Sequence, residues 1–260
     1  MRRWSSAGRR VLVQAAGALT VLGYGMECCA QVNVEPVRSQ LEETGRTFQV
    51  RGALSAYQGN TSGIALAVGG LVGWSSARDL VYLTASGDYS HLNHITSVAK
   101  AFAHVRYNRL LWERVHAEAF VQWEIDRFRR ITSRELLGVG PRFRLADGDE
   151  LRLYYGSSYM LELTQRRADA ARDVVAHRWN NYATLNYRPH ENVVLSETLY
   201  FQPRFDDFGN YFLLSIFSAH FRVTEVFSSG IDLRVRRESR APSGVVPTDT
   251  ELVNSLAFTF

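Results

Sequence analysis

Residues 115–126 have the sequence VHAEAFVQWEID, in which apolar and polar side chains alternate. Successive side chains of a β-strand point to opposite faces of a sheet, so this period of two predicts a strand with one apolar and one polar face. The apolar face carries Val115, Ala117, Ala119, Val121, Trp123 and Ile125. The polar face carries His116, Glu118, Gln122, Glu124 and Asp126.

The same alternation recurs about twelve times between Phe48 and Phe260, as in the strands of a membrane barrel. Connections expected to be short, such as residues 75–78 and 189–192, alternate with longer ones, such as residues 165–176. Outer-membrane barrels have short turns at the periplasmic end and longer loops at the other. We therefore predict an all-β fold, a closed antiparallel up-and-down transmembrane β-barrel of about 12 strands. A soluble, lipocalin-like barrel with its apolar face inward is the alternative.

The composition agrees with alternating strands and not with membrane helices. Hydrophobic residues make up 46% of the 260 residues, and the mean hydropathy is −0.17. The sequence contains no uninterrupted apolar run of about 18 residues, the length a helical span requires. In a barrel only alternate residues contact lipid, so the mean hydropathy stays near that of a soluble protein.

The first 30 residues resemble a secretory signal. Four arginines precede an apolar stretch at residues 11–22 that is too short to span a bilayer, and we expect cleavage after Ala30. An N-terminal core helix and a lipoprotein signal at Cys28 or Cys29 are the alternatives. Residues 31–46 would form a periplasmic lead-in, either a short amphipathic helix or a loose segment, and residues 47–260 would form the barrel. Cleavage lowers the formal charge from +4 to about +1, so the basic pI gives no support to nucleic-acid binding.

Aromatic residues on the apolar faces fall at the two ends of the predicted strands. Rings with a polar edge prefer the headgroup level of a membrane, so we predict two girdles. The periplasmic girdle would comprise Phe48, Trp74, Tyr107, Phe143, Tyr187, Phe221, Phe227 and the terminal Phe260. The outer girdle would comprise Tyr89, Trp123, Tyr159, Trp179 and Tyr211.

Several stretches occur in an order that is similar to one protein family. They are SAYQGNT (55–61), AFAHVRYN (101–108), AEAFVQ (117–122), DRFRR (126–130), LLGVG (136–140), LYFQP (199–203) and TDT (248–250). With these stretches the chain, from about Val34 to Phe260, resembles the salt-induced outer-membrane protein family, also called domain of unknown function 481. The resemblance implies an outer-membrane barrel without an assigned activity, and it implies no catalytic residues.

The polar faces of the predicted strands carry many charges, which would point into the lumen. The cationic set is Arg51, Lys100, Arg106, Arg142, Arg144, Arg152, Arg178, Arg222, Arg234 and Arg236. The anionic set is Glu118, Glu124, Asp126, Glu162, Asp232 and Glu238. Charge inside a barrel must be paired or hydrated. These residues predict either a network of ion pairs that fills a narrow interior, or a small water-filled pore that prefers anions or acidic oligosaccharides.

Two clusters near predicted outer loops suggest other chemistry. Ser90, His91 and His94 follow Asp88, so a hydrolase at the rim, either a phospholipase or a protease, is a rival hypothesis. Asp206 and Asp207 could bind Ca²⁺, although we favour a solvated turn as their explanation. We expect no catalytic residues, no resident metal and no cofactor.

The last strand ends with alternating Leu256, Phe258 and Phe260. This ending resembles the signal that the barrel-assembly machinery recognises, and strand addition would provide the mechanism. The function predicted from the sequence is a non-enzymatic barrel of a Gram-negative outer membrane, either structural or a narrow pore. Its expected partners are outer-membrane lipid and lipopolysaccharide, the assembly machinery and possible small anions.

Overall fold

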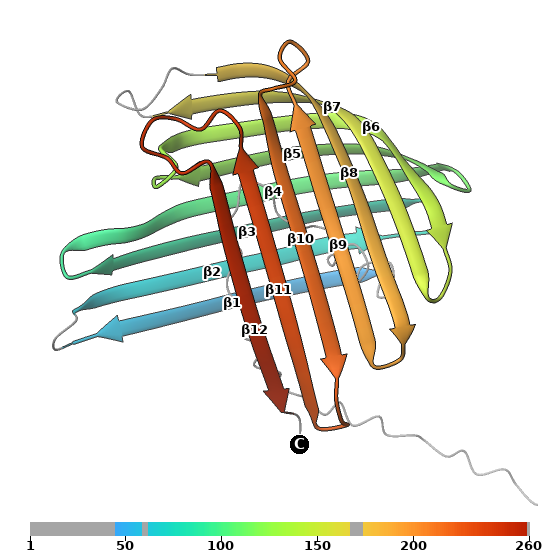
Figure 1. Ribbon diagram of the computed structural model, residues 1–260, viewed down its shortest axis with the longest axis horizontal. Helices are drawn as coiled ribbons and strands as arrows, with labels where there is room; N and C mark the ends of the chain where they lie inside the picture. Colours follow the sequence, from blue (N-terminus) through green and yellow to red (C-terminus); the bar gives the residue numbers. More distant parts are fainter. Residues whose placement is uncertain (1–44, 59–61, 167–173, 259–260) are drawn as a thin grey trace, which may run out of the picture.

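The computed structural model describes residues 45–58, 62–166 and 174–258. These residues form one antiparallel sheet of twelve strands (Figure 1). The strands are β1 (Arg46–Tyr57), β2 (Gly63–Ser75), β3 (Asp79–Leu92), β4 (Ile95–Trp112), β5 (Val115–Asp126), β6 (Ile131–Asp147), β7 (Leu151–Arg166), β8 (Val174–His190), β9 (Val193–Pro203), β10 (Tyr211–Arg222), β11 (Phe227–Glu238) and β12 (Thr248–Phe258). The predicted signal peptide, most of the lead-in and Phe260 lie outside the described residues.

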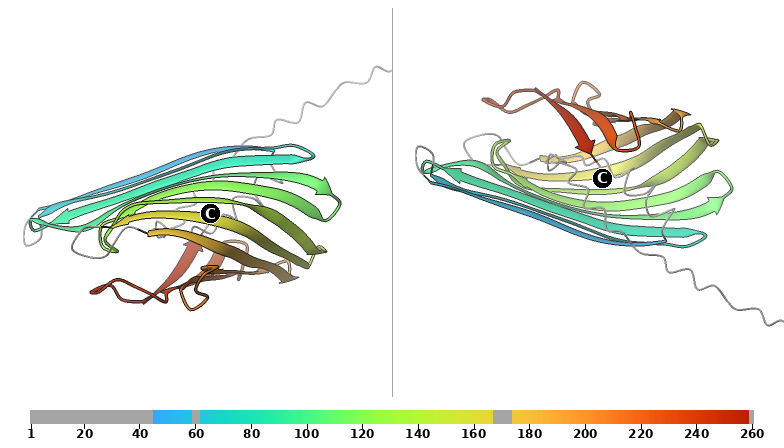
Figure 2. Two further views of the ribbon diagram at one scale, coloured as in Figure 1. Left: turned by 90° about the horizontal axis from the view of Figure 1, so that it is seen from above. Right: turned by 90° about the horizontal axis from the view of Figure 1, so that it is seen from below.

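Each strand pairs with the next one along the chain, so the topology is up-and-down from β1 to β12. The all-β, antiparallel prediction is confirmed, but the predicted closure is not seen. Within the described residues β1 pairs only with β2 and β12 only with β11, and the two edges lie apart in the curved sheet (Figure 2). The halves of the sheet instead contact each other through side chains in the concave interior. These contacts hold the middle of the sheet together. Within the described residues, the outer side of β1 and the outer side of β12 have no partner strand.

The alternation in the sequence becomes an inner and an outer face. In β5, His116, Glu118 and Gln122 are buried on the concave side, whereas Val121 and Trp123 are exposed on the convex side. Polar residues on the convex face have partners on that face. Glu197 accepts a hydrogen bond from Ser215 Oγ at 2.8 Å. Asn181 Oδ1 accepts one from Tyr155 at 2.8 Å.

The connections follow the predicted rule with one exception. Turns at the end of the sheet where β2 meets β3 are short, and most of those at the opposite end are longer. The exception is the connection of β3 to β4, which is a two-residue turn at Asn93 and His94 with φ of 49° and 66°. Positive φ at both central residues is the signature of a type I′ hairpin turn. The predicted outer loop at residues 90–94 is therefore mostly strand.

No helix within the described residues is long and apolar enough to cross a membrane.

Candidate functional site: the charged interior

Glu162, on β7, is the centre of one buried ion cluster. Its carboxylate lies 3.2 Å from Arg134 Nε of β6, and it accepts a hydrogen bond from Arg178 Nε of β8. Thr164 Oγ1 donates a further hydrogen bond at 2.8 Å. All four side chains are buried. Two guanidinium groups thus share one carboxylate in the interior.

An aromatic ring from the opposite half of the sheet contacts this cluster. The ring of Phe212 on β10 lies 4.3 Å from Arg134 Cζ and 4.1 Å from Arg178 Cζ. Arg178 also donates to the backbone oxygens of Gln202 and Asn210 at 3.0 and 3.2 Å. Cations over aromatic faces are attracted by the ring quadrupole, most strongly where water is excluded. The cluster therefore joins β6–β8 to β9 and β10.

Glu118, on β5, is the centre of a second cluster nearer the short-turn end. Arg106 lies 3.3 Å from its carboxylate, and Tyr182 donates a hydrogen bond to it at 2.7 Å. Arg142 donates to the Tyr182 hydroxyl at 3.1 Å, and its guanidinium stacks 4.2 Å from the centre of the Tyr154 ring. Arg142 is fully buried at 0% exposure. Large side chains thus fill the interior beside β4–β8.

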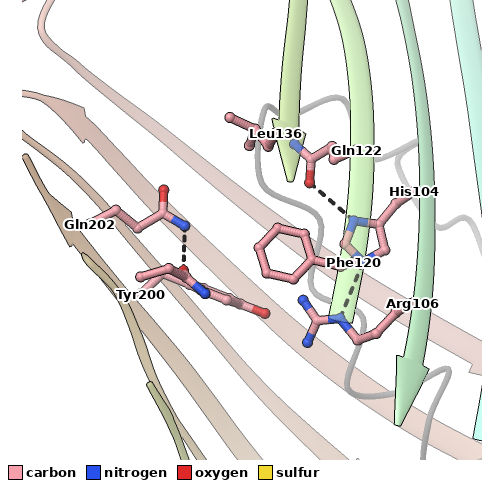
Figure 3. Close-up of a pocket in the computed structure, with 8 residues that line it drawn as sticks. His104, Arg106, Phe120, Gln122, Leu136, Tyr200 and Gln202 are labelled. Atoms are coloured by element: carbon pink, nitrogen blue, oxygen red, sulfur yellow. Dashed lines mark hydrogen bonds between the residues drawn. The ribbon is translucent and has the colours of Figure 1, made fainter. Parts of the chain in front are cut away.

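A polar chain along β4 and β5 runs from Arg106 of the second cluster through His104 to Gln122 (Figure 3). Arg106 Nε donates to His104 Nε2 at 3.2 Å, so the other ring nitrogen, Nδ1, carries the proton and donates to Gln122 Oε1 at 3.2 Å. The cavity between these residues, Phe120 and the residues of β8 and β9 opposite has a volume of about 20 Å³. A single water needs about 10–15 Å³ on this measure. This cavity therefore has room for about one water and not for a solute.

The third cluster bridges the interior at the end with the longer connections. Arg129, in the turn between β5 and β6, pairs with Glu238 of β11 at 2.8 Å and with Glu124 at 3.6 Å. Arg166, the last residue of β7, pairs with the other oxygen of Glu238 at 2.7 Å. The two contacts of Glu238 connect residues 109 and 72 positions apart in the sequence.

The remaining inner surface is more open. The inner positions of β2 carry small residues, such as Ala65, Ala67 and Gly69. On β11 and β12 the charges form partly exposed cross-strand pairs. Arg234 lies 2.8 Å from Glu251, and Arg236 lies 3.0 Å from Asp249. The interior is thus densely filled beside β4–β10, where Tyr82 of β3 also packs at 1% exposure, and sparsely filled beside β1, β2, β11 and β12.

The structure gives the predicted lumenal residues different environments. Arg106, Glu118, Glu124, Arg142, Arg178, Glu162 and Glu238 are buried in the three clusters. Lys100, Asp126, Arg234, Arg236 and Asp232 lie partly exposed on the open side, where Asp232 is 3.7 Å from His220. Arg144 and Arg152 contact Asp147 near the turn between β6 and β7, and Arg222 bonds Asn192 at a neighbouring turn. Arg51 is exposed on β1 and bonds Gln49.

Sequence reasoning missed Arg129, Arg134 and Arg166, which hold two of the clusters together. Arg166 falls within the connection predicted at residues 165–176, whereas the structure makes it the last residue of β7. Arg134 lies on the same face of β6 as Leu136, Gly138 and Arg142, and the alternation breaks only before it, at the register shift between Ile131 and Ser133. Arg129 lies in the turn after β5, where the alternation of strand faces does not apply and so does not predict the direction of its side chain.

The rim residues do not assemble into a hydrolytic site. Ser90 and His91 are neighbours in β3 and so point to opposite faces. His91 Nδ1 lies 3.2 Å from Thr96 Oγ1, and His94 is exposed in the turn. Asp206 is engaged by Arg204 at 2.8 Å, and this hydrogen bond lowers the pKa of the Asp206 carboxyl from its ordinary value. The described residues contain no group of three or more side chains suited to hold a metal.

The predicted girdle residues within the described part lie on the convex face. At the short-turn end these are Phe48, Trp74, Tyr107, Phe143, Tyr187, Phe221 and Phe227, and at the other end Tyr89, Trp123, Tyr159, Trp179 and Tyr211. The second group is extended by two rings from the turn between β9 and β10. Phe205 stacks on Tyr159 at 6.2 Å, and Phe208 meets Trp179 edge-on at 6.3 Å.

The described residues define the fold class of the protein. It is an up-and-down antiparallel sheet with an apolar convex face and a charged concave face. The chain belongs to the DUF481 family, described as proteins of unknown function, whose model matches residues 51–260. No curated protein sequence matches the chain.

Solved structures with a similar arrangement include three membrane proteins. A NanC porin is 11% identical, with a TM-score of 0.45, and the match covers 82% of this chain and 99% of that one. A KdgM porin is 9% identical, with a TM-score of 0.43 and the same two coverages. A bacterial polysaccharide outer membrane secretin is 12% identical, with a TM-score of 0.44, and the match covers 82% and 89% of the two chains.

Proposed function

We propose that this chain is a non-enzymatic barrel of a Gram-negative outer membrane that serves as a structural envelope protein or as a narrow pore. The observation that supports a narrow interior is the filling beside β4–β10. Arg142 and Glu162 are at most 1% exposed there, and the cavity beside His104 and Gln122 has room for about one water. An open general porin would need a wide aqueous lumen at this height.

The exposed apolar rows of the convex face support a lipid environment. Leu54, Val68, Val121, Val139 and Leu252 are all exposed on alternate positions of their strands. A lipocalin-like soluble barrel would turn such rows inward. A sheet can span a bilayer only when its edges are paired, because an unpaired backbone group in hydrocarbon costs several kcal/mol. The proposal therefore requires β1 and β12 to join in the membrane.

The strand register is compatible with this closure. Phe48 and Phe258 both lie on the convex face near the short-turn end, and their pairing places nearly all of β1 opposite β12. Phe48 has a cross-strand partner on β2, which has a partner on β3, and so on around the sheet. This row of partners reaches the β12 side at a position about 14 residues from Phe258 along the chain, and this offset is the shear of the closed barrel. A shear of about 14 over twelve strands corresponds to a tilt of about 40°, within the usual 35–45° of barrels.

Any conducting path would run along the sparsely filled side. Small residues of β2, such as Ala67, would face the charged pairs of β11 and β12 there. Because Arg234 and Arg236 are paired with Glu251 and Asp249, their charge is largely balanced. This balance favours a weakly selective pore for small ions over a channel specific for acidic oligosaccharides.

Planar-bilayer recording on the refolded protein tests the proposal. The wild type should show either no steps or small, weakly selective ones. Ala67→Trp places a large ring on the open inner side and should reduce any steps, whereas Ala103→Trp adds the same ring on the convex face and should leave them unchanged. Large steps that persist in Ala67→Trp would contradict a narrow path on this side.

A further inference from the structure

A depression about 250 Å³ in volume lies on the convex face over β2–β5. Gly87, Ala99 and Ala101 are its smallest lining residues, so side chains are short there. The flanking side chains are larger, namely Leu66, Val68, Tyr89 and Ile125. The convex surface is therefore hollowed along one apolar row instead of being uniformly covered.

One cation lies at the outer end of this groove. Arg127 lines it directly after the end of β5, and its backbone N–H donates to Ala99 O at 3.2 Å. The side chain of Arg127 is exposed. Tyr89, an outer-girdle residue in our sequence prediction, lies in the same cross-strand row as Ala99. The groove thus combines an apolar floor with a guanidinium at the end nearer the longer connections.

We propose that this groove binds a phosphorylated glycolipid of the lipid A type, with one acyl chain in the groove and a phosphate on Arg127. The inference rests on the proposed outer-membrane orientation, in which the end with the longer connections faces the leaflet that holds such lipids. An arginine fork matches phosphate geometry. The charge at the outer end and the narrow apolar floor both fit an acyl chain attached to an anionic headgroup.

The groove can be filled without disturbing the backbone. A Cβ added at Gly87 would meet Val68 Cγ2 at 3.7 Å and Lys100 O at 3.8 Å, which are ordinary contacts. Ala101→Leu adds apolar volume on the same floor. Ala119→Leu is the matched control, because Ala119 lies on the convex face of β5 towards the other end of the strand. Arg127→Gln removes the charge, and Arg114→Gln in the turn between β4 and β5 is its control.

The test is native mass spectrometry of full-length protein, isolated in detergent, titrated with bisphosphorylated lipid A, dephosphorylated lipid A or phosphatidylglycerol. Ala101→Leu should weaken binding of bisphosphorylated lipid A about tenfold, the equivalent of about two methylene groups displaced from apolar contact. Arg127→Gln should weaken it about threefold, as for a partly solvated ion pair, and should not change binding of the dephosphorylated lipid. Both control variants should bind as the wild type does.

Three results would overturn the inference: equal binding by Ala101→Leu and Ala119→Leu, an unchanged affinity in Arg127→Gln, or equally tight binding of phosphatidylglycerol. Heat-modified migration on gels verifies that each variant is folded, and Arg127→Gln provides the test if Ala101→Leu does not fold. Membrane fractionation distinguishes failure of the lipid-binding inference from failure of the proposed function. If only the lipid-binding inference is wrong, the protein is in the outer membrane but has no lipid preference. If the proposed function is wrong, the protein is absent from the outer membrane.

Discussion

Replacing Glu162 by glutamine should destabilise the folded barrel by about 3–5 kcal/mol, the usual cost of removing one partner of a buried ion cluster. The side chain is 1% exposed and has Arg134, Arg178 and Thr164 as partners within 3.2 Å. Glutamine preserves the shape but removes the negative charge. The two guanidinium groups would then lie close together in the interior without the carboxylate between them.

Equilibrium unfolding in urea, followed by tryptophan fluorescence of protein refolded into lipid vesicles, measures this loss. The matched control is Asp206→Asn, which removes the charge of an exposed pair with Arg204 and should leave the unfolding midpoint nearly unchanged. If Glu162→Gln unfolds at the same urea concentration as Asp206→Asn, the cluster is hydrated or differently paired. An interior filled by ion clusters would then be excluded.

Three further predictions concern packing, assembly and the outer bridge. Gly156→Ala should destabilise the barrel by about 1–3 kcal/mol, because its new Cβ would overlap the Tyr182 ring that bonds Glu118; an unchanged unfolding midpoint would show that the ring can move. Deletion of Phe260 should lower the amount of barrel assembled in the outer membrane of cells, and undiminished assembly would remove the assembly-signal hypothesis. Glu238→Gln should loosen the contact of β11 with Arg129 and Arg166, seen as faster hydrogen exchange in residues 127–130, and unchanged exchange would exclude a bridging role.

The sequence predicted the strands and their faces because both follow from local chemistry. A period of two needs only neighbouring residues, so the inner position of Glu118 and the outer position of Trp123 were predictable from β5 alone. The orientation of β9, ambiguous by pattern, follows in the structure from its pairing with β8, which places Tyr200 opposite the inward-facing Tyr182.

The ion clusters could not be predicted from the sequence. The alternation of a strand shows which face a residue lies on, but it does not show which residue it meets across the interior. Arg129 and Glu238 are 109 positions apart, and only the curvature of the whole sheet brings them together. The aromatic partners were missed for the same reason. In the sequence, Phe212 is an apolar residue of a strand with no indicated partner. In the structure, its ring lies against two arginines from β6 and β8.

Closure of the barrel depends on residues at opposite ends of the sequence and is tested most directly by a cross-link between β1 and β12. If Phe48 pairs with Phe258, then the inner residues Ala53 and Val253 are opposite each other. Their cysteine variants should form a disulfide in the membrane, in a chain whose Cys28 and Cys29 are serines, since paired strands satisfy the Cα separation of a disulfide. Ala53→Cys combined with Ala257→Cys, four residues out of register, should not cross-link. Folded protein in which the in-register pair stays reduced under oxidising conditions would contradict the closed barrel.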